Sequence, residues 1–297
     1  MPIPVYYHPS YSSLKLSDKH RFPIQKYQRL YEKIKHNKLD IEFFSPEKAP
    51  IESLLSVHDS QFVEQFLAGE LNQKAVRKMG FPWSKALVER TLFSIGASIQ
   101  GAKHALESGL ACQISGGYHH SFPSFASGFC IFNDLVISAK QLINSQECKK
   151  VVILDLDVHQ GDGTAVCAEN EPDIQTVSIH CEQNFPAVKQ HSDLDIGLNK
   201  GCDTESYLKT LDSCLLSVLS EQPDIILYNA GADIFTGDEL GYFDICLAGV
   251  QKRDRKVINF CRDHEIPLFA VSGGGYQRNL NSLVDVHYQL YRSIINT

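Results

Sequence analysis

The chain has 297 residues, of which 43% are hydrophobic and 21% are charged, so it is long enough to bury a large core. Its formal net charge of −7 argues against sequence-independent binding to nucleic acid, which needs clustered Lys and Arg to neutralise phosphates. Nine cysteines occur without a Cys-x-x-Cys pair, and no apolar run reaches the ~18 residues of a membrane span. We therefore expect a cytoplasmic protein with reduced thiols, no membrane span and no direct nucleic-acid partner.

Short apolar runs alternate with longer amphipathic segments along the chain. The runs are β-branched and nearly continuous in apolar character, which predicts strands at 111–117, 150–159, 174–180, 223–233 and 266–276. Helical spacing of apolar residues predicts helices at 132–142, 204–219 and 247–261. This order predicts an α/β fold with a parallel sheet and crossover helices on both faces. No repeat or long linker divides the chain, so we expect residues 1–297 to form a single domain.

Each predicted strand ends in a cluster of glycine and polar residues. In chain order the clusters read GGYHH, DLDVHQGDG, SIHCEQNFP, NAGAD and SGGGY. In open α/β sheets, ligands bind in the crevice outside the carboxyl ends of the strands. We therefore expect the five clusters to converge on one site.

The DLDVH segment carries the pattern of a metal site. Asp155, Asp157 and His159 alternate with apolar residues, so an extended strand points all three side chains to one face. Asp233, in NAGAD, supplies a third ligand to Asp157 and His159 and leaves a position for water, as in a catalytic zinc site. The same ligand types also suit iron or manganese. The alternative is that backbone amides of the following glycine-rich loop satisfy the carboxylates.

Two adjacent histidines, His119 and His120, follow the first predicted strand. Water activated by a metal needs a base, and a leaving group needs an acid; imidazole titrates in the range that suits both roles. Asp155 and Asp162 are candidates for holding the Nδ1 protons of the two rings. An isolated His-His pair is more often a satisfied loop pair, but its place beside the Asp/His cluster favours catalysis.

The last cluster, SGGGY, lacks the patterns of phosphate-binding loops. Three glycines instead allow the backbone to turn close to the metal and to present Tyr276. A phenol in this position donates a hydrogen bond to an oxyanion. The alternative is a half-buried core tyrosine.

Five motifs, in this order, resemble the zinc-dependent histone deacetylase family: GGYHHS (116–121), ASGFCIFND (126–134), DLDVHQGDG (155–163), NAGAD (229–233) and SGGGY (272–276). The segments HRFP (20–23) and GFPWSKALVERT (80–91) extend the resemblance over nearly the whole chain. The segments HQGDG, 228–241 and 253–254 most resemble class IV members and bacterial relatives. The resemblance implies the arginase/deacetylase fold, a three-layer α/β/α sandwich with a central, mainly parallel sheet.

The resemblance also implies roles for individual residues. Zinc is expected on Asp157, His159 and Asp233. His120, paired with Asp162, is expected to act as general base and general acid. His119, paired with Asp155, is expected to be its electrostatic partner. Tyr276 is expected to polarise the acyl carbonyl. Gly161 stands where arginase-like relatives carry a further Asp, which favours one catalytic metal ion.

A second ion and a substrate channel follow from the same resemblance. Potassium is expected on Asp155, the backbone carbonyls of Asp157 and His159, and the segment formed by Ser178 and Ile179. The residues expected to line the narrow channel are Gly128, Phe129, Phe185 and Gly274.

The function implied is removal of an acetyl or longer acyl group from the ε-amine of lysine in a protein or peptide. The single-domain length and the absence of a basic run like a nuclear-localisation signal favour a bacterial cytosolic enzyme. One alternative is a deacylase of small acylated amines such as acetylpolyamines, and another is a non-catalytic acyl-lysine-binding protein. Class I relatives grip the peptide backbone with an acidic loop residue, and the matching stretch 77–89 contains no Asp. This difference is the main sequence feature in favour of a small-amine substrate.

Overall fold

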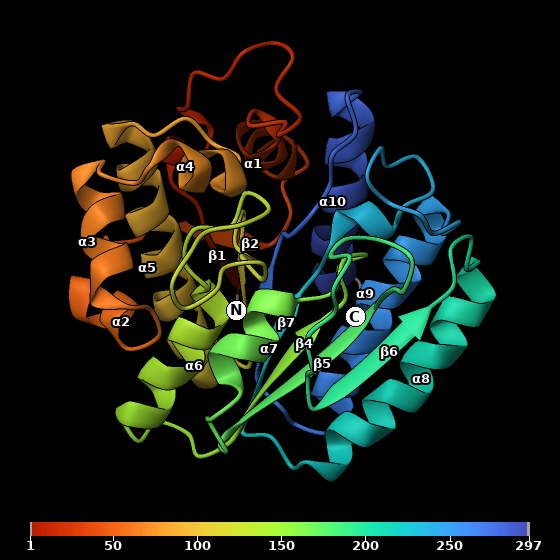
Figure 1. Cartoon of the computed structure of the whole chain (residues 1–297). Coiled ribbons are helices and arrows are strands. Elements are labelled where there is room, and N and C mark those ends of the chain that lie inside the picture. The colour runs from red at the N-terminus through yellow and green to blue at the C-terminus, as the bar shows by residue number, and fades with distance from the viewer. Residues whose placement is uncertain (1, 296–297) are drawn as a thin grey trace.

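A parallel sheet of eight strands runs through the molecule (Figure 1), and the computed structural model describes residues 2–295. The strand order is β2-β1-β3-β8-β7-β4-β5-β6, and every neighbouring pair is parallel. The predicted parallel sheet is thereby confirmed. The strands are β1 (Ile3–Tyr6), β2 (Ile41–Phe44), β3 (Leu110–Gln113), β4 (Val151–Asp155), β5 (Ile174–Cys181), β6 (Leu194–Leu198), β7 (Ile225–Asn229) and β8 (Leu268–Val271).

Helices cover both faces of the sheet, with α2 to α6 on one side and α8 to α10 on the other (Figure 1). This arrangement is the predicted three-layer α/β/α sandwich. Within the described residues, no helix combines the length and the apolar character that a membrane span requires. The helices are α1 (Lys26–His36), α2 (Ile51–Leu55), α3 (Ser60–Ala68), α4 (Gln73–Met79), α5 (Lys85–Ser108), α6 (Asp134–Asn144), α7 (Asp162–Ala168), α8 (Thr204–Ser220), α9 (Leu247–Asp263) and α10 (Leu280–Ile295), with short 3-10 turns η1 (Pro9–Ser12) and η2 (Ala232–Ile234).

The central strands are apolar on both faces because each face packs against a helical layer. Ile153 and Leu227 belong to the apolar cluster that contains most of the buried apolar side chains of α6. Their neighbours Leu154 and Tyr228 belong to the larger cluster that includes residues of α8, α9 and α10. Strand residues alternate between faces, so a strand buried on both sides reads as a continuous apolar run.

All five predicted strands are present, but β3, β4, β7 and β8 end earlier than predicted, whereas β5 extends one residue beyond its predicted end. The prediction that Asp157 and His159 continue one extended strand with Asp155 is wrong, because β4 ends at Asp155. The chain bends there, and the Asp155 carboxylate accepts a hydrogen bond from the Asp157 amide (3.1 Å). The Asp157 carboxylate in turn accepts one from the His159 amide (2.9 Å). These local bonds compete with the extended conformation and fix the loop.

A buried arginine on α9 joins the ends of β4 and β7. The Arg253 guanidinium donates to the carbonyl of Leu156 (3.3 Å) and to that of Gly231 (2.6 Å). It also donates to Asp254 (2.9 Å), which accepts a further hydrogen bond from Tyr228 (2.6 Å). Leu156 follows the last residue of β4, and Gly231 lies two residues beyond the end of β7. Arg253 therefore fixes the relative position of the two loops that carry Asp157 and Asp233.

Replacing Arg253 with Met is expected to lower the free energy of unfolding by about 3–5 kcal/mol, because the buried Asp254 carboxylate then loses its ion-pair partner. Urea denaturation of the purified variant measures this change. Lys252→Met, an exposed change on the same helix, is the matched control and should cost less than about 0.5 kcal/mol. Equal effects of the two substitutions would contradict the role of Arg253.

Candidate active site

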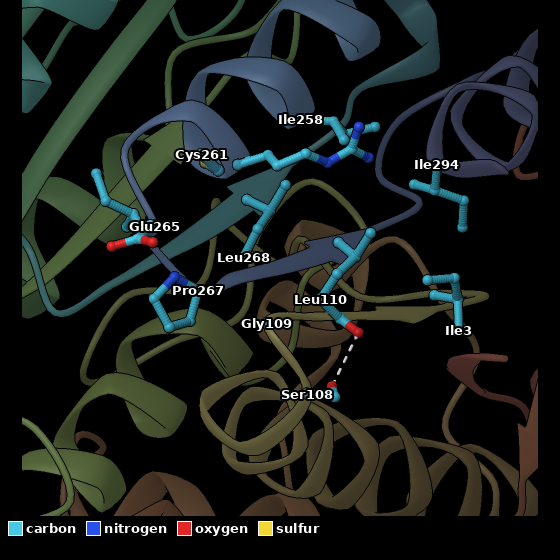
Figure 2. A pocket seen from close by; sticks show the side chains of 12 residues that line it. Ile3, Ser108, Gly109, Leu110, Ile258, Cys261, Glu265, Pro267, Leu268 and Ile294 are labelled. Carbon is cyan, nitrogen blue, oxygen red and sulfur yellow. Dashed lines mark hydrogen bonds between the residues drawn. The ribbon is translucent and has the colours of Figure 1, made fainter. Parts of the chain in front are cut away.

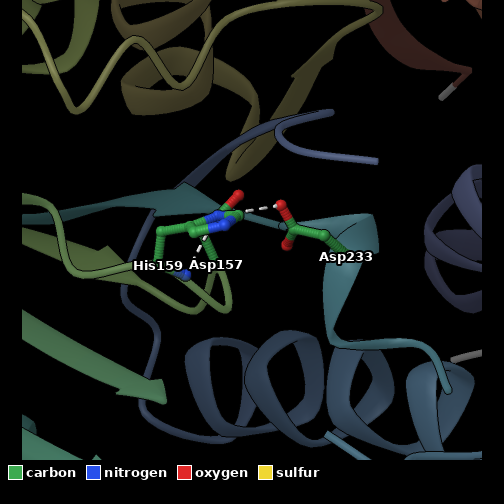
Figure 3. Close-up of side chains that lie close together, drawn as sticks. All are labelled: Asp157, His159 and Asp233. Carbon is green, nitrogen blue, oxygen red and sulfur yellow. Dashed lines mark hydrogen bonds and ion pairs between the residues drawn. The ribbon is translucent and has the colours of Figure 1, made fainter. Parts of the chain in front are cut away.

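Two carboxylates and an imidazole meet beyond the ends of β4 and β7 (Figure 3). Asp157 and His159 lie in the loop after β4, and Asp233 lies in η2 after β7. All three are buried, and one potential ligand atom from each lies within 4.8 Å of the others. The Nδ1 atom of His159 is 2.9 Å from Asp157 Oδ1 and 3.4 Å from Asp233 Oδ2. The structure thus brings together the three residues predicted as metal ligands.

The charges in this cluster fit a bound cation. Burial and repulsion from Asp233 raise the pKa of Asp157. Burial alone would lower the pKa of His159, but hydrogen bonds and charge interactions with the two carboxylates outweigh it and raise the pKa to about 10. The Oδ2 atom of Asp233 is buried without a hydrogen-bond partner. Two carboxylates, one imidazole and an unsatisfied oxygen suit zinc, and iron or manganese takes the same donors.

Glycine at position 274 lets the SGGGY loop close over the carboxylate pair. A Cβ atom at Gly274 would collide with the carboxylate oxygens of both Asp157 and Asp233. Its φ of 54° also lies in the left-handed region that favours glycine. Gly274 therefore forms part of the wall of the cluster, and its place in a substrate channel stays a prediction.

The two adjacent histidines have separate carboxylate partners. The Nδ1 atom of His119 lies 2.6 Å from Asp155 Oδ2, and that of His120 lies 2.6 Å from Asp162 Oδ1. Asp155 also accepts a hydrogen bond from the Asn229 side chain at the end of β7 (2.8 Å). Both imidazoles are buried. Because each Nδ1 faces a carboxylate, each ring turns Nε2 away from its partner.

These environments move the pKa values of the two histidines in opposite directions. Burial opposes a charge on His119, but Asp155 and Asp157 outweigh burial and raise the pKa to about 9. Burial and the neighbouring His119 charge lower the pKa of His120 to about 4, although Asp162 acts against them. At neutral pH His119 is therefore a cation and His120 is neutral. A neutral His120 that donates Nδ1–H to Asp162 has a free electron pair on Nε2.

A cavity of about 320 Å³ connects these groups with the surface. Its lining includes His120, His159 and Tyr276, and also Phe129 and Phe185, which were predicted for the channel. Gly128 lines it as well. We call this cavity the channel.

Tyr276 is half-buried at the channel and lies close to the metal cluster. Its ring centroid is 6.2 Å from that of His159, and its amide donates to the buried Asp238 carboxylate (2.7 Å). Burial, followed by the charges of Asp157 and Asp233, raises the pKa of Tyr276 well above its usual value. The phenol therefore keeps its proton and remains a hydrogen-bond donor.

The wall formed by Phe129 is held by the end of α4. The Phe129 amide donates to the Met79 carbonyl (3.0 Å), and its φ is 66°. Its ring packs on Gly80, where a Cβ atom would approach the ring to 2.7 Å. Gly80 has φ of 87°, which also favours glycine.

Lys26, the first residue of α1, is a residue of the site that sequence reasoning missed. Its ammonium group is buried and donates to the backbone carbonyls of Gly274 and Gly275. It also lies 5.6 Å from the centroid of the Tyr276 ring. Burial lowers the pKa of Lys26 to about 8, although Asp233 and Asp238 oppose the shift. Lys26 therefore ties the glycine-rich loop to α1.

The residues expected at a potassium site lie on neighbouring strands. Asp155 and Ser178 are register partners on β4 and β5, and both are buried. Ile179 follows Ser178 on β5, and the Ser178 hydroxyl lies 2.9 Å from His180 Nδ1. Potassium at this place stays a prediction.

A different cavity, of about 420 Å³, lies near the amino ends of β3 and β8, and Figure 2 shows the side chains that line it. Leu110 and Leu268, the first residues of β3 and β8, contribute to its lining. The lining is mainly aliphatic, with Glu265 as its carboxylate and no histidine. Its chemistry therefore differs from that at the carboxyl ends of the strands.

Similarity to known proteins extends over most of the chain. A family model described as the histone deacetylase domain matches residues 20–290. An uncharacterized protein of Picosynechococcus sp. is 40% identical over 296 residues, which cover 99% of this chain and 98% of that protein. Histone deacetylase 2 of Arabidopsis thaliana is 33% identical over 189 residues, covering 62% of this chain and 49% of the relative. Probable histone deacetylase 1-A of Xenopus laevis is 28% identical over 259 residues, covering 80% and 53%. The chain spans about half the length of these two named relatives.

We expect zinc to stabilise the folded protein, because an ion held by the Asp157, His159 and Asp233 ligand set favours the native state over an unfolded chain that does not present that set. At a hundredfold excess of free zinc over Kd, the gain is about 2.7 kcal/mol. Thermal melting of chelator-treated protein, with and without zinc, measures it. Asp233→Asn should abolish most of the increase in Tm, whereas Asp263→Asn, an exposed change at the end of α9, should retain it. An undiminished increase in Asp233→Asn would contradict the assignment.

Proposed function

The chain belongs to the histone deacetylase family, and we propose that it is a zinc-dependent amidohydrolase that removes acetyl or longer acyl groups from the ε-amine of lysine in proteins or peptides. One observation carries this proposal: His159 of the Asp157, His159 and Asp233 cluster lines the channel together with the neutral His120 and the protonated Tyr276. We further propose that residues 1–297 act as one catalytic domain in the cytoplasm, with potassium beside the zinc.

The proposed chemistry divides between the metal and the side chains. Zinc held by Asp157, His159 and Asp233 would supply Lewis acidity for the acyl carbonyl and for water. The Nε2 atom of His120 accepts the proton of the attacking water, while the bond from Nδ1 to Asp162 keeps the ring in the required tautomer and orientation. The same imidazole then returns the proton to the amine that leaves.

His119 and Tyr276 stabilise charge around the reacting carbonyl. The His119 cation, paired with Asp155, balances the negative charge that develops nearby. The Tyr276 phenol donates a hydrogen bond to the carbonyl oxygen as that oxygen becomes negative. Both groups are held in place before the reaction, so little reorganisation is needed.

The channel suits a long, unbranched acylated side chain. Phe129 and Phe185 present aromatic rings to its interior, and His120 packs edge-on against Phe185 with a centroid distance of 4.8 Å. The apolar walls match the methylene groups of an acyl-lysine, whereas the polar groups gather at His120, His159 and Tyr276.

Zinc-loaded protein is expected to release an acyl group from at least one lysine peptide in a panel carrying acetyl, octanoyl or myristoyl groups. Tyr276→Phe should lower kcat by about 10²- to 10³-fold, the usual effect of removing an oxyanion donor. Tyr288→Phe on α10, packed beside Lys33, is the matched control and should retain activity. Mass spectrometry of the peptides measures release, with chelated protein as a blank. If zinc is bound and none of the peptides loses its acyl group, the proposal is refuted.

The pH dependence of kcat/KM should reveal the coupling between the two histidines. His120 must be neutral to accept a proton, so activity falls at low pH as His120 becomes protonated. The positive charge of His119 lowers the pKa of His120, so His119→Asn removes that charge and raises the pKa. The acidic limb of the profile should therefore move to higher pH. An acidic limb that stays in place or moves to lower pH would contradict the proposed division of roles.

A further inference from the structure

A second cavity, of about 490 Å³, adjoins the mouth of the channel, and we call it the side groove. The two cavities share Gly128, Phe129 and Phe185 in their linings. A substrate that inserts a side chain into the channel must therefore place its neighbouring groups near the side groove. The remaining lining of the groove includes Arg77, Lys78, Phe122, Pro186, Val188 and Gln190.

The charges available at this surface are positive. Arg77 and Lys78 lie in the last turn of α4 and are exposed, and Arg21 is exposed beside the channel. Within residues 2–295, neither Arg21 nor Arg77 has an ion-pair partner. The Lys78 ammonium is positioned over the ring of Phe125, at 3.3 Å from the centroid. The chain carries a formal net charge of −7, so this cationic mouth does not reflect its overall composition.

The linings of the two cavities contain one carboxylate, Asp162, and it is less accessible to a substrate than the cationic groups are. Asp162 lines the side groove, but it is 4% exposed and its Oδ1 lies 2.6 Å from His120 Nδ1. The channel lining contains no Asp or Glu. A cationic group at the mouth would therefore meet like charges, and an anionic group would meet two guanidinium groups and an ammonium group.

Apolar side chains lie beside these cations. Val188 is 74% exposed and Phe185 is 45% exposed, and both line the side groove with Pro186. A short apolar stem that ends in a carboxylate, such as a Glu side chain, matches this combination of an apolar wall and positive charge.

Building on the proposed function, we propose that the side groove and Arg21 select acyl-lysine substrates that carry a carboxylate next to the acylated residue. The substrate class is thus an acidic acyl-lysine peptide rather than a basic peptide tail. The same charges act against acylated polyamines, because the free amines of a polyamine are cationic at neutral pH.

The test uses three acyl-lysine peptides of equal length, all carrying the acyl group that the panel above shows to be released fastest. They differ only in the two residues flanking the acyl-lysine, which are Glu, Gln or Lys. For zinc-loaded wild-type protein at low ionic strength, kcat/KM should follow the order Glu, Gln, Lys, with roughly a tenfold ratio between the first and the last. The ratio should shrink at high salt, because exposed charges are screened.

Charge reversal locates the effect. The double variant Arg77→Glu with Lys78→Glu should invert the ratio between the Glu and Lys peptides, whatever its absolute activity. The control, Lys209→Glu with Lys252→Glu, makes the same change in net charge on exposed residues of α8 and α9 and should keep the wild-type ratio.

The outcomes separate this inference from the proposed function. Equal turnover of the three peptides, a preference for the Lys peptide, or an unchanged ratio in the Arg77 and Lys78 variant would overturn the inference and leave the deacylase activity standing. No turnover of any peptide by zinc-loaded protein would contradict the proposed function itself, and the inference with it.

Discussion

The close approach of two buried carboxylates, Asp157 and Asp233, is the constraint around which this molecule is arranged. Two negative charges in a dry interior repel each other and each loses its hydration, so the fold must hold them together by other means. Arg253 holds the two loops together because its guanidinium donates hydrogen bonds to the carbonyls of Leu156 and Gly231. The backbone at Gly274 can approach the two carboxylates closely because glycine has no side chain that would clash with them. The cluster is thus a receptor for positive charge that is built into the framework of the sheet.

The nearby carboxylates also give the adjacent residues His119 and His120 different protonation states. His119 faces Asp155 and lies 3.8 Å from Asp157 through its second nitrogen, so it retains a proton. His120 has Asp162 as its carboxylate partner and stands beside the charged His119, with a distance of 4.0 Å between ring centroids. Their opposite pKa shifts follow from their neighbours rather than from their own chemistry. A dry site with several carboxylates can therefore hold both a cation and a neutral base.

The sequence was sufficient to predict the centre of the sheet, because strands covered on both faces are continuous apolar runs. The edge strands β2 and β6 escaped prediction because their side chains are partly exposed and their apolar signal is weak. The interior strand β1, a four-residue segment that contains Pro4, also escaped prediction. The convergence of the strand ends follows from parallel topology, and the metal-ligand trio was proposed from residue types. The bend after Asp155 was not predictable from alternation, because side-chain hydrogen bonds to the backbone break the strand. Lys26 resembles an ordinary exposed lysine in sequence, and its burial depends on carbonyls of Gly274 and Gly275 at the other end of the chain.

The contact of Phe129 with Met79 and Gly80 restricts how the substrate preference of such a protein can change by mutation. One wall of the channel is anchored to the same turn of α4 that presents Arg77 and Lys78 to the outside. The width of the channel and the charge at its mouth therefore both depend on the end of α4, and they do not vary independently. A mutation that shifts this helix end alters both traits together, even though it lies far in sequence from Asp157, His159 and Asp233. New substrate ranges in this lineage are therefore expected to arise through linked changes in the N-terminal third of the chain, while the strand tips that hold the reactive groups stay the same.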